Sequence, residues 1–392
     1  MKIKLIEIFD VHCEKRTSWH PVFVRITTDS GISGVGEAGL AYDSGHSAAT
    51  AMIKEFAELF LVNFNPNNKE KLWNKILRES FWGLGGGPIL YSAMSAIDTA
   101  LWDIQGKALN VPVYQLLGGK TNNKLRTYAS QLQFGWDNEK RYTFSDPEDY
   151  ALATEKVIKE GFDAVKVDPM MFDNNGETIY DCTLPFKTQH LKLIRKRLQA
   201  IRDVLGDDGD IIFECHSLPS VTSAIQLGQI AEEFNCLYFE EPVNYINSKL
   251  HKPLKDKLNV PLAAGERLYL RHGVREYIES QTVDILQPDI GLCGGLTEAK
   301  KICDYADLYD IKVQAHVCGG PVATAVALHL ETAIPNFIIH EHHTYALKDF
   351  NRELCLQDLQ PQNGYFQVSD QPGIGIELND NALKKSHKII VK

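Results

Sequence analysis

Residues 237–242 read Leu-Tyr-Phe-Glu-Glu-Pro, and residues 262–267 read Leu-Ala-Ala-Gly-Glu-Arg. A little earlier, residues 211–216 read Ile-Ile-Phe-Glu-Cys-His. In each case a short apolar run ends in charged or ionisable side chains. Solubility alone does not place carboxylates inside such runs, whereas a buried strand that ends at a functional site does.

The same pattern recurs eight times along the chain, with helical periodicity between the runs. The runs are Leu125–Ser130, Ala164–Asp168, Ile211–His216, Leu237–Pro242, Leu262–Arg267, Ile285–Asp289, Lys312–His316 and Phe337–His342. From the fourth run onward the starts lie about 25 residues apart, which is the length of one strand–helix unit. The pattern predicts an α/β fold of the (β/α)₈ barrel type, in which chemistry takes place at the carboxyl ends of the strands.

The regions on either side of these runs follow other patterns. Strand periodicity at Met1–Glu14 and Pro21–Thr28, followed by helical periodicity at His46–Phe64 and Ile89–Leu109, predicts a small α+β domain. After His343 a non-helical tail replaces the last helix. We therefore expect an α+β domain over residues 1–124, a barrel over 125–350, and a tail over 351–392 that packs back on the first domain.

Composition excludes several classes of protein. The 392 residues are 44% hydrophobic and 23% charged, and 41 basic against 51 acidic residues give a net charge of -10. This composition is that of a globular protein, and the negative charge argues against nucleic acid or an anionic membrane as a partner. The eight cysteines include no C-x-x-C pair, and no apolar run is long enough for a membrane span or a signal peptide. We expect a cytoplasmic location.

Three glutamates close consecutive predicted strands: Glu214, Glu240 and Glu266. Three converging carboxylates repel one another unless a cation neutralises them, and all-carboxylate ligation suits Mg²⁺ before Mn²⁺ or Ca²⁺. Alternatively, one or two of them pair with Lys or Arg. Strand alternation allows only one of Glu240 and its neighbour Glu241 to face inward.

Further ionisable groups close the other strands. Asp289 and His316 end strands six and seven, and a carboxylate beside an imidazole is the arrangement of a general base. Lys166 shares a face with Asp168, as Glu214 does with His216. Glu341 on strand eight could hydrogen-bond a developing oxyanion if it is held protonated. A metal cluster of the neighbouring residues His340, His342 and His343 is an alternative that strand alternation disfavours.

Residues 93–119, AMSAIDTALWDIQGKALNVPVYQLLGG, together with the order of the barrel motifs, resemble the mandelate racemase branch of the enolase superfamily. The resemblance covers essentially the whole chain. It implies a modified (β/α)₇β barrel with an N-terminal α+β capping domain, Mg²⁺ on Glu214, Glu240 and Glu266, and removal of a proton alpha to a carboxylate. Asp289 and His316 would form the base dyad, and Glu341 would be the acid on the enolate side.

Within this branch, Glu214-Cys215-His216 is similar to the acid-sugar dehydratases of the galactonate and mannonate type. There, a histidine two residues past the first ligand protonates the departing hydroxide. The sequence departs from the pattern of the family at two positions. The first metal ligand of the family is more often Asp than Glu, and Lys166-Val167-Asp168 stands where racemases have Lys-x-Lys. Asp168 beside Lys166 would keep the ammonium charged, so that Lys166 would clamp the substrate and not act as a base.

The resemblance also places two cap loops over the far end of the substrate. Trp19 and His20, in the loop Thr17–Pro21, and Tyr42, after Gly36-Glu37, would then contact the substrate, although each could equally be a packing residue. We expect an Mg²⁺-dependent dehydratase that converts a small-molecule sugar acid to a 2-keto-3-deoxy acid. The alternatives are a racemase or epimerase using the same enediolate, and a non-catalytic ligand-binding homolog. By resemblance, the protein should be a homo-oligomer.

Overall fold

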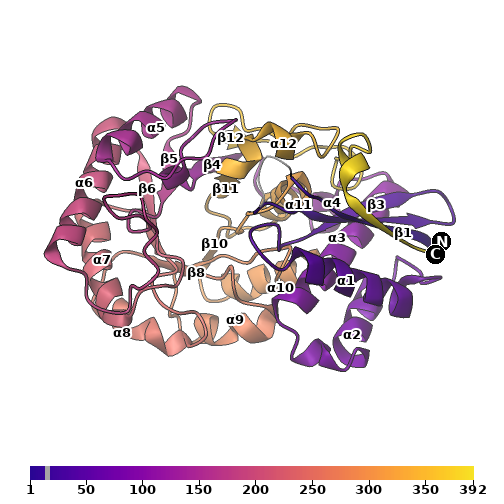
Figure 1. The fold of residues 1–392 in the computed structure, drawn as a ribbon. Coiled ribbons are helices and arrows are strands. Elements are labelled where there is room, and N and C mark those ends of the chain that lie inside the picture. Colours follow the sequence, from indigo (N-terminus) through magenta and orange to yellow (C-terminus); the bar gives the residue numbers. More distant parts are fainter. Residues whose placement is uncertain (14–17) are drawn as a thin grey trace.

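The computed structural model describes residues 1–13 and 18–392. Glu14 and Thr17, where the expected first strand ends and the first cap loop begins, lie outside the described residues. Figure 1 shows two parts side by side, a barrel of parallel strands ringed by helices and a smaller domain built on an antiparallel sheet.

The barrel strands coincide with the eight predicted runs. They are β4 (Leu125–Ser130), β5 (Ala164–Val167), β6 (Asp210–Glu214), β7 (Tyr238–Glu240), β8 (Leu262–Ala264), β9 (Ile285–Leu286), β10 (Lys312–Val313) and β11 (His340–His343). Neighbouring strands pair in parallel from β10 back to β4, and β4 pairs with β11. A parallel bridge between Val313 and Phe337 closes the ring. The predicted fold class is confirmed.

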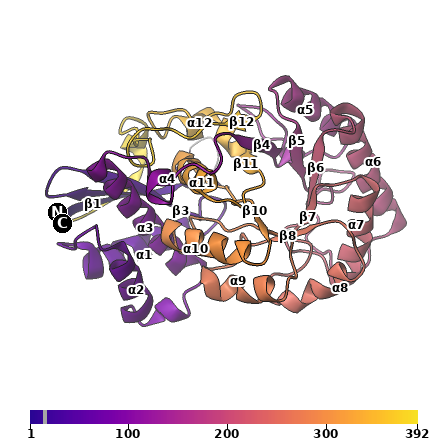
Figure 2. The same cartoon turned by 180° about the vertical axis from the view of Figure 1, so that it is seen from behind.

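Helices surround the barrel on its outer side, as Figure 2 shows from behind. They are α5 (Pro147–Lys159), α6 (Thr188–Leu205), α7 (Val221–Glu233), α8 (Lys252–Lys255), α9 (Leu270–Glu279), α10 (Leu296–Asp307) and α11 (Pro321–Ala333). The short helix α12 (Asp349–Arg352) follows β11 in place of a full barrel helix, and β12 (Tyr365–Phe366) pairs with β4. Within the described part of the chain, no helix is long and apolar enough to cross a membrane.

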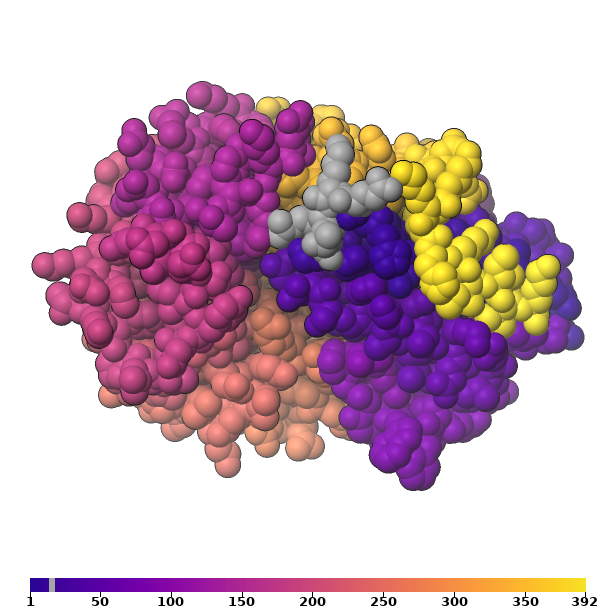
Figure 3. Space-filling model, viewed as in Figure 1, coloured from indigo at the N-terminus to yellow at the C-terminus, as the bar shows by residue number. Residues whose placement is uncertain are grey.

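The smaller domain contains a four-stranded antiparallel sheet in the order β13-β1-β2-β3. Its strands are β1 (Ile3–Asp10), β2 (Val22–Thr28), β3 (Ser33–Ala38) and β13 (His387–Val391). Its helices are α1 (His46–Phe56), α2 (Lys69–Glu79), α3 (Pro88–Leu109) and α4 (Val113–Leu116). Because β13 is the last strand of the chain, both termini lie at this sheet, and Figure 3 shows the yellow C-terminal segment against the indigo N-terminal one.

Helix α3 joins this domain to the barrel. It packs so closely on β3 that a Cβ atom at Gly36 would lie 1.9 Å from the carbonyl oxygen of Ala96. On its other side, Asp98 accepts hydrogen bonds from the backbone N–H and the hydroxyl of Thr297 at the start of α10. Buried Asp103 accepts from the N–H groups of Val35 and Ile374. These contacts explain why the segment 93–119 combines small residues with two buried aspartates.

The end of β3 also contacts the rim of the barrel. The N–H of Gly39 donates to the carbonyl of Gly291, and the Glu37 carboxylate accepts from the N–H groups of Gly320 and Ala323 at the start of α11. The loop after β3, which carries Tyr42, therefore lies over the carboxyl ends of the barrel strands.

Candidate active site

Side-chain alternation decides which strand-end residues face the barrel axis. One buried cluster is contributed by successive barrel strands and consists of Tyr128, Ala164, Ile212, Tyr238, Ala263, Ile285 and Ile339. Alternate side chains on a strand point to the same face, so the residue two positions beyond each member also faces inward. This rule places Lys166, Glu214, Glu240 and Glu341 directly above the barrel core.

The three predicted metal ligands meet at this level. Glu214 and Glu240 pair in register on β6 and β7, and Glu266 follows β8 by two residues. One oxygen of each lies within 4.8 Å of the others, and all three side chains are buried. The pKa of Glu240 is raised to about 8, chiefly by burial and then, against the opposing charge of Lys166, by Glu214. Burial and the neighbouring carboxylate therefore disfavour the ionised form of Glu240 more than the nearby ammonium of Lys166 favours it.

These residues fit a hard divalent cation. Although it is buried, Oε2 of Glu240 has no hydrogen-bond partner among the described residues. An unpartnered carboxylate oxygen beside two further carboxylates is a donor set that suits Mg²⁺. Glu214, Glu240 and Glu266 are thus the residues that would hold the ion.

Glu241 belongs to a different environment from Glu240. Its backbone φ is 44°, so the chain turns out of the strand immediately after Glu240. Oε2 of Glu241 accepts a hydrogen bond from Nε of Arg267 at 3.0 Å, and the same guanidinium lies 2.9 Å from Oε1 of Glu266. Burial would raise the pKa of Glu266, but Arg267 and His316 outweigh this effect and lower it to about 2. The alternative, in which ligands pair with Lys or Arg, therefore describes Glu266 beside Arg267, and also Glu240 and Glu214, which lie 2.6 Å and 3.4 Å from the ammonium of Lys166.

The predicted pairing of Lys166 with Asp168 is wrong. The ammonium of Lys166 lies 2.6 Å from Glu240, 2.9 Å from Glu341 and 3.4 Å from Glu214. Burial alone would lower the pKa of Lys166, but these three carboxylates hold it well above its ordinary value. Lys166 is charged, as expected, but its partners are other residues, because the chain leaves the strand before Asp168 and turns its carboxylate toward β6.

Glu341 is an ionised acceptor in this structure, not the protonated donor that the sequence suggested. Burial favours the neutral form, but the charge of Lys166, followed by that of His316, lowers the pKa of Glu341 far below its ordinary value. Its two oxygens accept from the hydroxyl of Ser130 at 2.6 Å and the N–H of Val317 at 2.9 Å.

Asp289 and His316 form the predicted dyad. They face each other across a parallel bridge, with Nδ1 of His316 2.7 Å from Oδ2 of Asp289. Nε2 of His316 points toward the metal-ligand cluster, 3.5 Å from Oε2 of Glu266. Burial lowers the pKa of His316, but Glu266 and Asp289 outweigh burial and raise it to about 10.

Asp168 and His216 form a second dyad that the sequence did not predict. Nδ1 of His216 lies 2.8 Å from Oδ2 of Asp168, while Nε2 lies 3.3 Å from Oε1 of Glu214. Against the opposing effect of burial, Glu214 and Asp168 raise the pKa of His216 to about 10. Both imidazoles are therefore oriented by a carboxylate at Nδ1 and present Nε2 to a proposed metal ligand.

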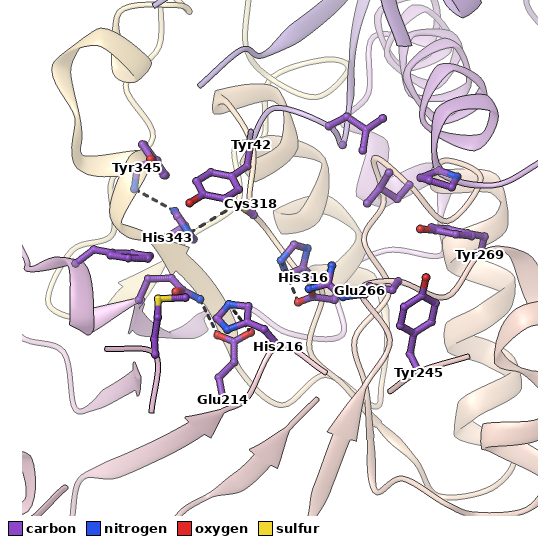
Figure 4. A pocket seen from close by; sticks show the side chains of 18 residues that line it. Tyr42, Glu214, His216, Tyr245, Glu266, Tyr269, His316, Cys318, His343 and Tyr345 are labelled. Atoms are coloured by element: carbon purple, nitrogen blue, oxygen red, sulfur yellow. Dashed lines mark hydrogen bonds and ion pairs between the residues drawn. The ribbon is translucent and has the colours of Figure 1, made fainter. Parts of the chain in front are cut away.

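The site opens into a cavity of about 400 Å³. Figure 4 shows Glu214, His216, Glu266 and His316 pointing into it. Its wall includes Tyr42, Phe134, Met171, Tyr245, Tyr269, Cys318, His343 and Tyr345. The predicted residues Lys166, Asp168, Glu240, Asp289 and Glu341 are buried outside this lining.

The predicted cap contacts have different outcomes. Tyr42 lines the cavity. Trp19 is fully buried and lies outside the lining, where its ring stacks on Tyr345 at 4.1 Å and its Nε1 donates to Asn351. His20 also lies outside the lining and stacks on His46 in the capping domain. The packing alternative therefore describes Trp19 in this structure, and neither Trp19 nor His20 lines the cavity.

Three polar residues of the site were not among the predicted ones. Nε2 of Gln131 donates to Oε2 of Glu214 at 2.6 Å, Ser130 binds Glu341, and Arg267 pairs with Glu266. Ser130 and Gln131 end the first barrel strand. The sequence signal for Ser130 and Gln131 is a strand end that is polar without being ionisable, whereas Arg267 ends the fifth predicted run.

The alternative histidine metal cluster is not found among the described residues. Nδ1 of His340 bonds to Oε2 of Glu331, whereas Nε2 of His343 contacts the thiol of Cys318. Alternation along β11 places His340 and His342 beside Phe366 and His343 on the opposite face.

A closed parallel barrel with buried carboxylates and paired acid–base groups at the carboxyl ends of its strands is the arrangement of a barrel enzyme with its active site at that face. A family model described as "Enolase C-terminal domain-like" matches residues 149–382. A model of the mandelate racemase / muconate lactonizing enzyme N-terminal domain matches residues 9–118. The chain belongs to this mandelate racemase branch of the enolase superfamily.

Named relatives extend over nearly the whole chain. A D-xylonate dehydratase of Haloferax volcanii is 32% identical over 383 residues, which are 96% of this chain and 88% of the relative. A D-gluconate/D-galactonate dehydratase of Picrophilus torridus is 32% identical over 390 residues, 98% of this chain and 93% of the relative. Both relatives are named as dehydratases, a class of carbon–oxygen lyases.

Two solved structures that are described as putative dehydratases are similar to this chain at higher sequence identity. The crystal structure of a putative dehydratase protein from Salmonella enterica serovar Typhimurium has a TM-score of 0.97 at 50% identity and covers 100% of both chains. A putative dehydratase from Zymomonas mobilis has a TM-score of 0.97 at 45% identity, covering 100% of this chain and 99% of the other.

Proposed function

We propose that this enzyme, a carbon–oxygen lyase of the hydro-lyase class, dehydrates a sugar acid to a 2-keto-3-deoxy acid in an Mg²⁺-dependent reaction. The observation that carries the proposal is the pair of Asp–His dyads that direct Nε2 atoms to one buried carboxylate cluster. One dyad can remove a proton while the other supplies one, which is what the elimination of water requires.

Mg²⁺ would be held by Glu214, Glu240 and Glu266. When bound, this ion stabilises the negative charge that develops on the substrate carboxylate. The charged ammonium of Lys166, buried among Glu214, Glu240 and Glu341, adds a second positive charge beside this cluster.

His316 takes the proton alpha to the substrate carboxylate. Asp289 holds the Nδ1–H of this imidazole, so Nε2 carries the lone pair that acts as the base. Glu266 contributes the largest favourable effect to the imidazolium of His316. A cation held by Glu266 would offset the charge of this carboxylate. The pKa of His316 would then fall, which favours the neutral imidazole that acts as the base.

His216 supplies the proton that the departing group needs. Asp168 stabilises its imidazolium form through Nδ1, so Nε2 can donate a proton to the β-hydroxyl. The α C–H bond and the β C–O bond break, water leaves, and the resulting enol tautomerises to the 2-keto-3-deoxy acid.

The cavity wall suits a polyhydroxylated substrate. Four tyrosines and His343 place hydroxyl and imidazole groups around the catalytic groups: Tyr42, Tyr245, Tyr269 and Tyr345. Such side chains can hydrogen-bond the hydroxyls of a sugar acid. A small-molecule sugar acid is therefore the proposed substrate, and D-xylonate, D-gluconate and D-galactonate are the first compounds to test.

The second dyad also favours one alternative, epimerisation at the α-carbon with His216 as the second base. A racemase that used Lys166 as this base is disfavoured, because the ammonium of Lys166 also pairs at 2.9 Å with Glu341, which is not one of the proposed metal ligands.

The test is a screen of a sugar-acid library with Mg²⁺ present, in which 2-keto products are detected by their reaction with semicarbazide. We expect one or a few stereoisomers to give a 2-keto acid, and His316→Asn to give none. A product that keeps its β-hydroxyl and is inverted at the α-carbon would replace dehydration by epimerisation. Ligand binding without turnover of any sugar acid would favour the non-catalytic homolog.

A further inference from the structure

A second group of metal-ligating side chains lies in the capping domain, outside the catalytic cavity. Asp10 ends β1, His20 precedes β2, and His46 is the first residue of α1. One ligand atom from each of the three lies within 4.8 Å of the other two. None of the three lines the catalytic cavity.

The contacts within this cluster are close. Nδ1 of His46 lies 2.9 Å from Oδ1 of Asp10, whose side chain is buried. The rings of His20 and His46 lie 4.0 Å apart and nearly parallel. A third imidazole, that of His12, lies 5.3 Å from the ring of His20 and 5.8 Å from that of His46.

We propose that Asp10, His20 and His46 form a binding site for a divalent transition-metal ion of the Zn²⁺ type. Two imidazoles and one carboxylate are a donor set that Zn²⁺ uses with three protein ligands, leaving a fourth position for water or for His12. Imidazole donors disfavour Mg²⁺, which prefers oxygen ligands and retains its water. The protein would therefore carry two metal sites of different chemistry.

The backbone holds these ligands on three separate elements. The N–H of His20 donates to the carbonyl of Ala41, and Trp19 forms a bridge with Tyr42. These contacts keep residues 18–20 beside the loop that leads to His46. An ion bound here would link the end of β1, the segment before β2 and the start of α1, and would therefore stabilise the capping domain.

A different explanation is that Asp10 and His46 form only an ion pair on which His20 packs. The two explanations differ in what happens when Zn²⁺ is added. Untagged protein is stripped with EDTA, dialysed into excess Mg²⁺ to fill the barrel carboxylates, and titrated with Zn²⁺ by calorimetry. We expect one Zn²⁺ to bind per chain under these conditions, and the thermal midpoint of unfolding to rise with it.

Variants locate the bound ion. Loss of an outer partner typically weakens metal binding by about 10- to 100-fold, so loss of a ligand in His20→Gln or His46→Gln should weaken it at least as much. The matched control is His272→Gln, which changes an exposed histidine on α9 and should leave Zn²⁺ binding unchanged. Glu266→Gln should also leave it unchanged, because Glu266 belongs to the barrel site.

X-ray absorption of the wild-type Zn²⁺ protein does not depend on how any variant folds. A shell that contains two imidazoles supports the proposal, and an all-oxygen shell overturns it. The proposal also fails if wild-type protein binds no Zn²⁺ in excess Mg²⁺, if His20→Gln and His46→Gln both retain wild-type affinity, or if Glu266→Gln removes the binding.

Discussion

At the scale of single residues, Glu240 and Glu241 are chain neighbours with different environments. Glu240 lies two positions beyond the inward-facing Tyr238, whereas Glu241 follows the turn out of the strand and pairs with Arg267. We predict that Glu240→Gln abolishes Mg²⁺ binding and activity, because one carboxylate ligand is lost. Glu241→Gln should retain Mg²⁺ binding and serves as the matched control in the same calorimetric titration.

Wild-type protein treated with EDTA should likewise be inactive and recover when Mg²⁺ is returned. Full activity in the metal-free protein would rule out a catalytic metal. Loss of Mg²⁺ binding in Glu241→Gln with retention in Glu240→Gln would show that the strand register is wrong by one residue.

The two histidines provide a second prediction at this scale. Because His316 is proposed to remove the α-proton, His316→Asn should abolish both turnover and exchange of the substrate α-hydrogen with D₂O. His216→Asn should lower the rate of dehydration about 10²- to 10⁴-fold, which is the usual contribution of a general acid to a rate. Exchange of the α-hydrogen should stay detectable in this variant. Product formation and exchange are both followed by proton NMR in D₂O.

If the enzyme is instead an epimerase with two histidine bases, the exchange experiment gives a different pattern. Each variant would then lose exchange from one epimer of the substrate and keep it from the other. Normal dehydration by His216→Asn would exclude His216 as the acid.

At the scale of elements, the end of β3 and the start of α11 meet through one buried carboxylate. Burial is the main cause that raises the pKa of Glu37 from 4.5 to about 7, against the lowering effect of the Gly320 and Ala323 N–H groups. Because the folded state holds this proton more tightly than the unfolded state, the stabilisation is complete below about pH 4.5 and is lost as the pH rises to about 7.

Glu37→Gln should remove this pH dependence, because the amide cannot ionise. A pKa difference of this size corresponds to roughly 3 kcal/mol. Relative to wild type, the variant should therefore gain up to roughly 3 kcal/mol in the free energy of unfolding between pH 5 and pH 8. Urea unfolding at the two pH values measures the difference. Glu79→Gln on α2, an exposed position, is the control, and an equal effect of Glu37→Gln at both pH values would contradict the prediction.

At the scale of the whole molecule, exposed apolar side chains gather in the connection between α2 and α3. Phe81, Trp82 and Leu84 are 78%, 73% and 66% exposed. Large exposed aromatic side chains are typical of contact surfaces between proteins, which supports the predicted homo-oligomer. We expect a sedimentation mass that is a multiple of 44.1 kDa, and a shift toward the single chain in Trp82→Ser. A single species of 44.1 kDa at micromolar concentration would contradict the prediction.

The barrel strands and most of the residues at their ends could be predicted from the amino-acid sequence. Eight apolar runs were sufficient because hydrophobic periodicity is local, and because parallel strands present their carboxyl ends at one edge. Glu214, Glu240 and Glu266 could be grouped on the same grounds. Asp289 and His316 could be paired because they end neighbouring strands.

The contacts between charged groups could not be predicted in the same way. Lys166 pairs with Glu240 and Glu341, and Asp168 pairs with His216, because these contacts depend on where each chain segment turns after its strand. Trp19 and His20 could not be placed from the sequence, because the same aromatic side chains serve for packing and for binding. Their neighbours Tyr345 and His46 come from distant parts of the chain, and folding alone brings them together.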